Sequence, residues 1–119
     1  MIAINVDSAK NTILVKIAGA ISAEQTTKAV IKLFEVAPKM KENFSVINDI
    51  SGLLTISAEQ SETLNKVNQK LLNTYKINKI IRVVGKSRDV LIQLSVSDKR
   101  TGLKNVIYVP TMKEAIQLL

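Results

Sequence analysis

The chain has 119 residues, 46% of them hydrophobic and only 3% aromatic, so we expect one domain with an aliphatic core. It contains no cysteine and no histidine, which excludes disulfides, thiolate metal sites, thiol catalysis and the commonest general base. No apolar run approaches the roughly 18 residues that a membrane span needs, and the first residues lack the pattern of a signal peptide. We therefore expect a single cytoplasmic domain over residues 1–119, without a membrane span, a metal or a cofactor.

The net charge of +7 is concentrated in one part of the chain. Residues 65–104 contain ten basic and two acidic residues, a net charge of +8, whereas residues 1–64 carry a net charge of −1. A basic surface of this kind indicates an anionic partner, which would be a protein, a nucleic acid or lipid headgroups. The alternative is a solvated, lysine-rich surface without a partner.

The first two predicted elements are short strands, at residues 2–6 and 12–18, where hydrophobic residues alternate with others. The turn between them is too short for a crossover, so we expect an antiparallel hairpin. Ser22-Ala23-Glu24-Gln25 then forms a capping box that starts a helix, and Pro38 ends it. The inward side of this helix is predicted to consist of Ala29, Val30, Leu33, Phe34 and Ala37.

The next predicted unit is a buried strand at residues 44–49, a turn at Gly52 and a second capping box, Ser57–Gln60. This box starts a second helix, after which the β-branched residues 79–84 form a further strand that Gly85 ends. The inward residues of the second helix are predicted to be Leu64, Val67, Leu71 and Tyr75.

Ser87 is the predicted cap of a third helix, which Gly102 ends. Residues 105–109 form the last predicted strand, and Thr111–Glu114 is a further capping box that starts a terminal helix. The predicted buried residues are Val90, Leu91, Leu94 and Val96 in the third helix, and Met112, Ala115, Ile116 and Leu119 in the last.

Two regularities support this order of elements. Gly19, Gly52 and Gly85 are each 33 residues apart, and the pentapeptide Ile-Ser-Ala-Glu-Gln occurs twice, at residues 21–25 and 56–60. The order β-β-α-β-α-β-α-β-α predicts an α/β fold with one mixed, mostly parallel sheet and an antiparallel edge strand. The glycine turns then gather at one edge of the sheet, where binding sites of open α/β sheets usually form.

The segment Val46-Ile47-Asn48-Asp49-Ile50-Ser51-Gly52, in this order of elements, resembles the STAS family, the anti-sigma-factor antagonists and their SpoIIAA-like relatives. The family strand ends in Asp-Leu-Ser, which Asp49-Ile50-Ser51 matches, and an Asp-Ser-Ser/Thr-Gly motif follows at the helix start. That motif falls on Ser57-Ala58-Glu59-Gln60, so Glu59 stands where the family has a phosphorylated hydroxyl. The resemblance implies a STAS-like, non-enzymatic binding or regulatory module with a kinase-like or sigma-related protein partner.

Glu59 has two interpretations. It is either a fixed negative charge that partly mimics the phosphorylated state, at a helix N-terminus that favours anions, or a plain first-turn residue like Glu24 in the other pentapeptide. Asp49 is likewise either a site carboxylate at a strand end or an acceptor for turn amides.

Gly85-Lys86-Ser87 matches the end of a phosphate-binding P-loop, but Ile80 replaces the first glycine, which argues against nucleotide hydrolysis. The start of the Ser87 helix, with Lys86 and Arg88, could still hold a phosphate or a carboxylate, or it is a helix cap flanked by exposed bases. Nucleic-acid binding is disfavoured because the basic half of the chain has only two aromatic residues for base stacking, Tyr75 and Tyr108, and one of them lies in a strand.

We therefore predict a binding module and not an enzyme, because no acid–base pair of carboxylates and no serine–histidine arrangement is present. The alternative is a carrier or sensor of a small anionic or lipid-like ligand between the sheet and its helices. The predicted binding residues are Asp49, Ser51, Gly52, Ser57, Glu59, Lys86, Ser87 and Arg88.

Overall fold

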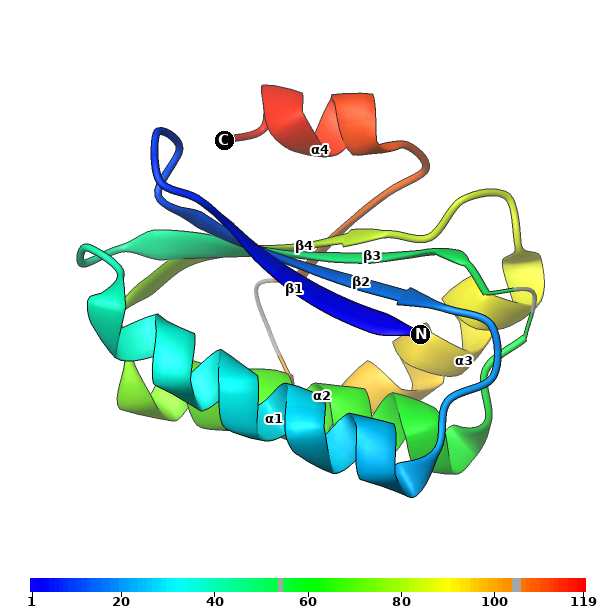
Figure 1. Cartoon of the computed structure of the whole chain (residues 1–119). Helices are drawn as coiled ribbons and strands as arrows, with labels where there is room; N and C mark the ends of the chain where they lie inside the picture. The colour runs from blue at the N-terminus through cyan, green and yellow to red at the C-terminus, as the bar shows by residue number, and fades with distance from the viewer. Residues whose placement is uncertain (54, 104–105) are drawn as a thin grey trace.

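A computed structural model of the chain describes residues 1–53, 55–103 and 106–119. Within these residues it has a five-stranded sheet and four α-helices, in the predicted order (Figure 1). The strands are β1 (Ile2–Asp7), β2 (Thr12–Ala18), β3 (Phe44–Gly52), β4 (Ile77–Val83) and β5 (Val106–Val109). The helices are α1 (Ala23–Val36), α2 (Ala58–Thr74), α3 (Arg88–Thr101) and α4 (Met112–Gln117), with the short 3-10 helix η1 (Ala37–Lys39) after α1.

The sheet is mixed and its strands follow the chain, in the spatial order β1-β2-β3-β4-β5. β1 pairs antiparallel with β2, and the pairs β2–β3, β3–β4 and β4–β5 are parallel. The predicted antiparallel edge hairpin and mostly parallel sheet are therefore confirmed. Three helices, α1, α2 and α3, cover one face of the sheet, and α4 lies on the other face (Figure 1).

The two faces of the sheet bury two separate hydrophobic clusters. The larger cluster lies toward α1, α2 and α3, and the smaller one lies toward α4. In β4 the side chains alternate between them, since Ile80 belongs to the larger cluster whereas Ile81 and Val83 belong to the smaller. Strands buried on both faces need nearly continuous apolar sequences, which explains the β-branched run predicted from the sequence.

The helix caps agree with the sequence prediction. Ser22 Oγ accepts a hydrogen bond from the amide of Gln25 (3.1 Å), and the Gln25 side chain accepts one from the Ser22 amide (2.9 Å). Ser57 and Gln60 repeat this capping box at the start of α2 (3.0 and 3.1 Å). At α4, Thr111 Oγ1 accepts from the Glu114 amide (3.3 Å), which is one half of the predicted box.

The predicted inward face of α3 is partly wrong. Val90 and Leu94 are fully buried as predicted, but Leu91 and Val96 are exposed. The third buried position of this helix is Ser97, because only one narrow stripe of α3 faces the rest of the molecule. The outer side of α3 therefore carries exposed hydrophobic side chains, including Ile92.

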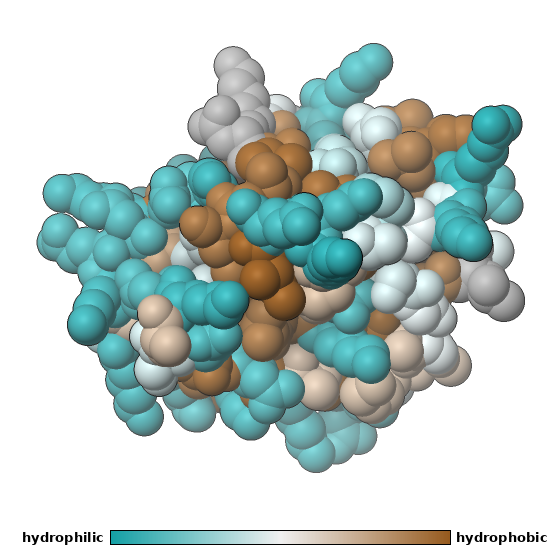
Figure 2. Space-filling model, turned by 90° about the horizontal axis from the view of Figure 1, so that it is seen from above, coloured by the Kyte–Doolittle hydropathy of each residue, from teal (hydrophilic) through white to brown (hydrophobic). Residues whose placement is uncertain are grey.

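The predicted inward face of α4 is also partly wrong. Ala115 is buried and Met112 is half-buried, whereas Ile116 and Leu119 are exposed, and Leu118 is half-buried instead. The helix has six residues and packs on β4 and β5, so it covers only part of the upper face of the sheet. Hydrophobic residues remain visible between hydrophilic ones on this face (Figure 2).

Three strands are longer than predicted. β1 gains one residue, Asp7, which pairs with Thr12 of β2. β3 continues to Gly52, which pairs with Ala18 of β2, and β4 already begins at Ile77, which pairs with Phe44 of β3. In each case pairing with a neighbouring strand extends an element beyond the residues with strong β-propensity. Asn105, the first residue of the last predicted strand, lies outside the described residues.

Candidate functional site

The three glycine turns lie at one edge of the sheet, as predicted. β2, β3 and β4 are parallel, so the turns that follow them meet at the edge where these strands end, here called the carboxyl edge. The contacts are close: a Cβ atom on Gly52 would lie 2.9 Å from Ala18 Cβ, and one on Gly85 would lie 3.3 Å from Ser51 Cα. Gly19 and Gly85 also have positive φ angles of 67° and 65°.

Four of the eight predicted binding residues lie around one open depression at the carboxyl edge. Ser51, at the end of β3, lines it together with Lys86, Ser87 and Arg88 from the start of α3. Asp89 lines the same depression, so the charged groups of its described lining are two cations and one carboxylate. Ser87 Oγ also accepts a hydrogen bond from the Val90 amide (3.3 Å), which makes it the cap of α3.

Asp49 acts as a local hydrogen-bond acceptor. Its Oδ1 atom accepts from the Ser51 amide (3.1 Å) and from Ser51 Oγ (2.6 Å). This agrees with the second interpretation of Asp49, in which the carboxylate stabilises the end of the strand. The other predicted residue on β3, Gly52, serves the close pairing with β2.

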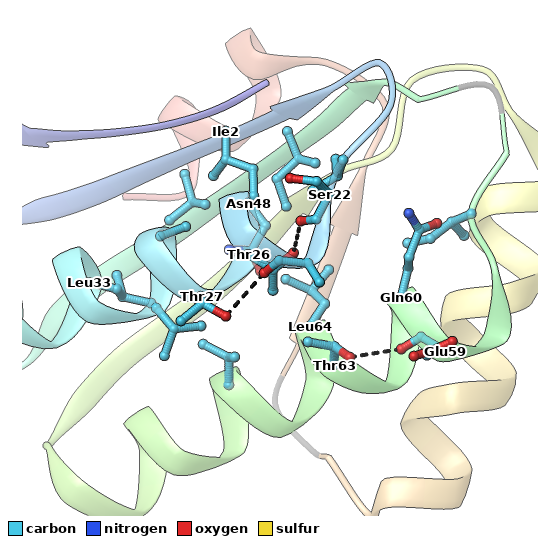
Figure 3. Close-up of a pocket in the computed structure, with 18 of the residues that line it drawn as sticks. Ile2, Ser22, Thr26, Thr27, Leu33, Asn48, Glu59, Gln60, Thr63 and Leu64 are labelled. Atoms are coloured by element: carbon cyan, nitrogen blue, oxygen red, sulfur yellow. Dashed lines mark hydrogen bonds between the residues drawn. The ribbon is translucent and has the colours of Figure 1, made fainter.

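The remaining two predicted residues, Ser57 and Glu59, lie at a different and more enclosed cavity. This cavity, here called the inter-helix cavity, has a volume of about 570 Å³ and lies between α1, α2 and the face of β1, β2 and β3 that they cover (Figure 3). Its floor on the sheet contains Ile4, Val15 and Ile17, and most of its lining is aliphatic. Pockets of this size and character are typical of small-molecule sites.

The two copies of the repeated pentapeptide flank the mouth of the inter-helix cavity. The exposed lining residues all belong to the caps and first two turns of α1 and α2, so the cavity opens there. They are Ser22, Ala23, Thr27, Ser57, Glu59 and Gln60. The repetition of the pentapeptide in the sequence does not predict that both copies lie at one cavity, because each copy is explained as a local helix start.

Two buried amide side chains, here called the amide pair, interrupt the aliphatic interior of the cavity. Asn48 of β3 and Asn68 of α2 both line it, and each residue is only 1% exposed. Asn68 Nδ2 donates to Asn48 Oδ1 at 3.0 Å. The Asn48 Nδ2 and Asn68 Oδ1 atoms have no protein hydrogen-bond partner among the described residues.

The cavity carries little charge. Glu59 is the only ionisable side chain among the described residues that line it, and it is exposed at the mouth. The hydroxyl groups on the walls are engaged locally, since Thr27 Oγ1 donates to the Ala23 carbonyl (3.0 Å) and Thr63 Oγ1 to the Glu59 carbonyl (2.9 Å; Figure 3). The interior can therefore accept apolar groups and a neutral polar group.

Arg82 belongs to a buried cluster and not to the predicted basic surface. It is fully buried on β4, where Nη1 donates to the Asp98 carboxylate (3.0 Å) and to Tyr108 Oη (3.2 Å), and Nη2 donates to Asn65 Oδ1. Asn65 Nδ2 also donates to Asp98 (2.7 Å). Burial lowers the pKa of Arg82, and the nearby Asp98 carboxylate partly offsets this by raising it.

Sequence reasoning missed this cluster and the amide pair for one reason. Both depend on α2, whose side toward the sheet carries the buried polar residues Ser61, Asn65 and Asn68 beside the predicted apolar ones. These positions have helical spacing, but a pattern of apolar residues does not include them because their side chains are polar.

Comparison with known proteins adds no relative: no family model matches the chain, and a search of curated proteins finds no similar sequence. Among the described residues, no helix combines the length and the hydrophobicity needed to cross a membrane. The described residues also contain no group of three or more acidic side chains close enough to hold a metal ion.

Proposed function

We propose that the protein is a non-enzymatic module that binds a small, mainly apolar molecule in the inter-helix cavity. The observation that carries this proposal is the cavity itself, an aliphatic space of about 570 Å³ that opens between the starts of α1 and α2. Apolar side chains that line an open cavity meet water unless another molecule covers them, so a concave aliphatic surface of this size needs an explanation. A bound ligand provides one.

The chemistry of the lining favours binding over catalysis. Catalysis at neutral pH needs a nucleophile or an acid–base group near the reacting atoms. The hydroxyls of Ser22 and Ser57 accept hydrogen bonds from the helix amides that they cap, and the only carboxylate of the described lining belongs to Glu59 at the mouth. We place this module in the cytoplasm, because a chain without cysteine needs no oxidising compartment.

A fluorescent probe tests the proposal directly. N-phenylnaphthylamine is uncharged and becomes fluorescent in apolar sites, so the purified protein should bind it saturably. Ala29→Phe places a ring inside the cavity and should abolish this binding, whereas Ile31→Phe, on the exposed side of the same helix, should not change it. Equal binding by both variants, or no binding by the unmodified protein, would show that the cavity is not a ligand site. Native mass spectrometry should reveal a co-purified molecule.

A second candidate function is protein binding by a STAS-like module. It is favoured by the exposed position of Glu59 in the first turn of α2, together with the exposed Leu91 and Ile92 on α3. The partner implied by the resemblance is a kinase-like or sigma-related protein, and Glu59 would act as a fixed negative charge. Nucleic acid remains a disfavoured partner.

Two matched charge reversals test this second function. Glu59→Lys should abolish the recovery of an identified kinase-like or sigma-related partner in a pull-down. Glu24→Lys changes the same position of the other pentapeptide, where the carboxylate pairs with Lys28 on an exposed surface, and should leave recovery unchanged. Equal recovery with both variants would exclude a role of Glu59 as a mimic of a phosphorylated residue.

A further inference from the structure

We infer that the ligand of the inter-helix cavity is an uncharged amphiphile, with an apolar body and one polar head that both donates and accepts hydrogen bonds. A fatty alcohol and a fatty amide have this chemistry. The inference rests on the proposed ligand-binding function. Of the two ligand classes expected from the sequence, anionic and lipid-like, it selects a neutral lipid-like one. It also assigns the polar head to the amide pair, Asn48 and Asn68.

The amide pair has hydrogen-bonding capacity that no protein group among the described residues uses. An asparagine side chain has two donor hydrogens and one acceptor oxygen. The single bond from Asn68 Nδ2 to Asn48 Oδ1 leaves the Asn48 amide as a donor and Asn68 Oδ1 as an acceptor. The oxygen and nitrogen of an asparagine amide can be assigned in two orientations. If both side chains are turned over, Asn48 donates to Asn68, and the pair still has one unused donor and one unused acceptor.

This unused hydrogen-bonding capacity lies at the inter-helix cavity. Both residues are 1% exposed and both line the cavity, so these groups are nearly removed from bulk water. Buried polar groups are normally paired, because an unmade hydrogen bond in an apolar site is costly. The aliphatic residues Val15 and Leu64 line the same space, so a ligand's polar head would find its partners at the amide pair.

The charge of the cavity lining disfavours an anionic head. An anionic head in the cavity would need a cation or several free donors, but no lysine or arginine is among the described residues that line it. The only ionisable lining residue is Glu59, which repels anions at the mouth. A neutral head avoids both penalties, and a hydroxyl or a carboxamide can use the donor and the acceptor together.

A series of ligands that share a dodecyl chain and differ in the charge of the head group tests this inference on the unmodified protein. The series is dodecanol below its solubility limit, and dodecyl sulfate and dodecyltrimethylammonium below their micelle concentrations. Dodecanol should displace N-phenylnaphthylamine at lower concentration than either charged ligand. Tighter binding of the sulfate would overturn the inference. The inference would also be overturned if dodecyltrimethylammonium bound most tightly and lost this advantage in Glu59→Gln. That result would place the head group at the mouth, beside Glu59.

A pair of variants tests the assigned position of the head. Asn68→Leu should weaken dodecanol about 3- to 10-fold, the range expected for one neutral hydrogen bond, and leave N-phenylnaphthylamine binding unchanged. Thr63→Val removes a lining hydroxyl near the mouth and should affect neither ligand.

The two proposals can fail separately. If the unmodified protein does not bind the fluorescent probe, the proposed function is wrong. If it binds the probe but dodecanol loses nothing in Asn68→Leu, or loses as much in Thr63→Val, only the assignment of the polar head is wrong. Retained probe binding by each variant shows that its cavity is intact, so a folding defect cannot be mistaken for either result.

Discussion

Arg82, near the end of β4, and Asp98, in α3, form an ion pair of 3.0 Å in which the arginine side chain is fully buried and the aspartate side chain is 13% exposed. Asn65 of α2 bonds to both partners. One polar cluster therefore joins the sheet to two helices, at a place where the larger hydrophobic cluster would otherwise continue. Directional bonds of this kind fix the helices relative to the sheet in a way that aliphatic contacts alone do not.

Removing the carboxylate of this ion pair should strongly destabilise the fold. Asp98→Ala leaves a buried guanidinium without its counterion, so we expect the free energy of unfolding to fall by about 3–5 kcal/mol. Urea denaturation followed by circular dichroism measures this change. The control is Glu62→Ala, which removes the partner of Arg100 from a pair whose side chains are 31% and 56% exposed, and should cost less than about 1 kcal/mol. Equal losses would mean that burial does not set the importance of the pair.

Removing both charges should cost less than the two separate losses added together. Arg82→Met keeps much of the side-chain volume and also removes the Nε atom, which is buried without a partner among the described residues. In the double variant Arg82→Met/Asp98→Ala no uncompensated charge remains buried. We expect a coupling of about 1–3 kcal/mol in a double-mutant cycle, measured by the same denaturation. Additive losses would contradict direct coupling of the two residues.

The sequence predicted the features of this fold that depend on local chemistry. The capping boxes at Ser22 and Ser57, the glycine turns and the edge hairpin follow from short segments whose residues interact with one another. Which side of an amphipathic helix faces the core is harder to predict from the sequence, because it depends on where the neighbouring elements lie. Leu91 and Val96 belong to the helical pattern of α3, but their side chains are exposed because they lie outside the buried stripe of the helix.

The corrected phase of α3 makes a quantitative prediction. Leu94 is fully buried, so Leu94→Ala should cost about 2–5 kcal/mol through lost contacts and the cavity left behind. Ile92 is 60% exposed, so Ile92→Ala should change the free energy of unfolding by less than about 0.5 kcal/mol. A large loss from Ile92→Ala in denaturation at low protein concentration would contradict the observed orientation of the helix.

The candidate site was harder to predict than the fold. Ser51, Lys86, Ser87 and Arg88 come together because each adjoins a strand end at the carboxyl edge, which the order of elements implies. The inter-helix cavity depends instead on the space between α1 and α2, which no local pattern encodes. Asn48 and Asn68 are separated by 20 residues, and each looks like an ordinary polar residue until the fold brings them together.

The two equivalent caps should contribute similar amounts to stability. Ser57→Ala and Ser22→Ala each remove the hydroxyl that accepts the amide of the third helical residue, so each should cost about 1 kcal/mol. Ser57→Asp keeps an acceptor at the cap and should restore most of the loss. Thermal and urea denaturation measure these differences. A loss in Ser57→Ala that Ser57→Asp does not restore would assign the residue a role other than capping.

Two of the glycine turns at the carboxyl edge share a backbone conformation but differ in their surroundings. Gly19 and Gly85 have nearly equal positive φ angles, 67° and 65°. A Cβ atom on Gly19 would meet nothing within 4 Å, whereas one on Gly85 would lie 3.3 Å from both Ser51 Cα and Ser51 Cβ. Gly19→Ala should therefore cost only the backbone strain, about 1–2 kcal/mol. Gly85→Ala should cost measurably more in urea denaturation, because the added methyl also presses on the end of β3. Equal losses would show that β3 and the turn before α3 are packed less tightly than their contact implies, and the depression between them would then lack a rigid frame.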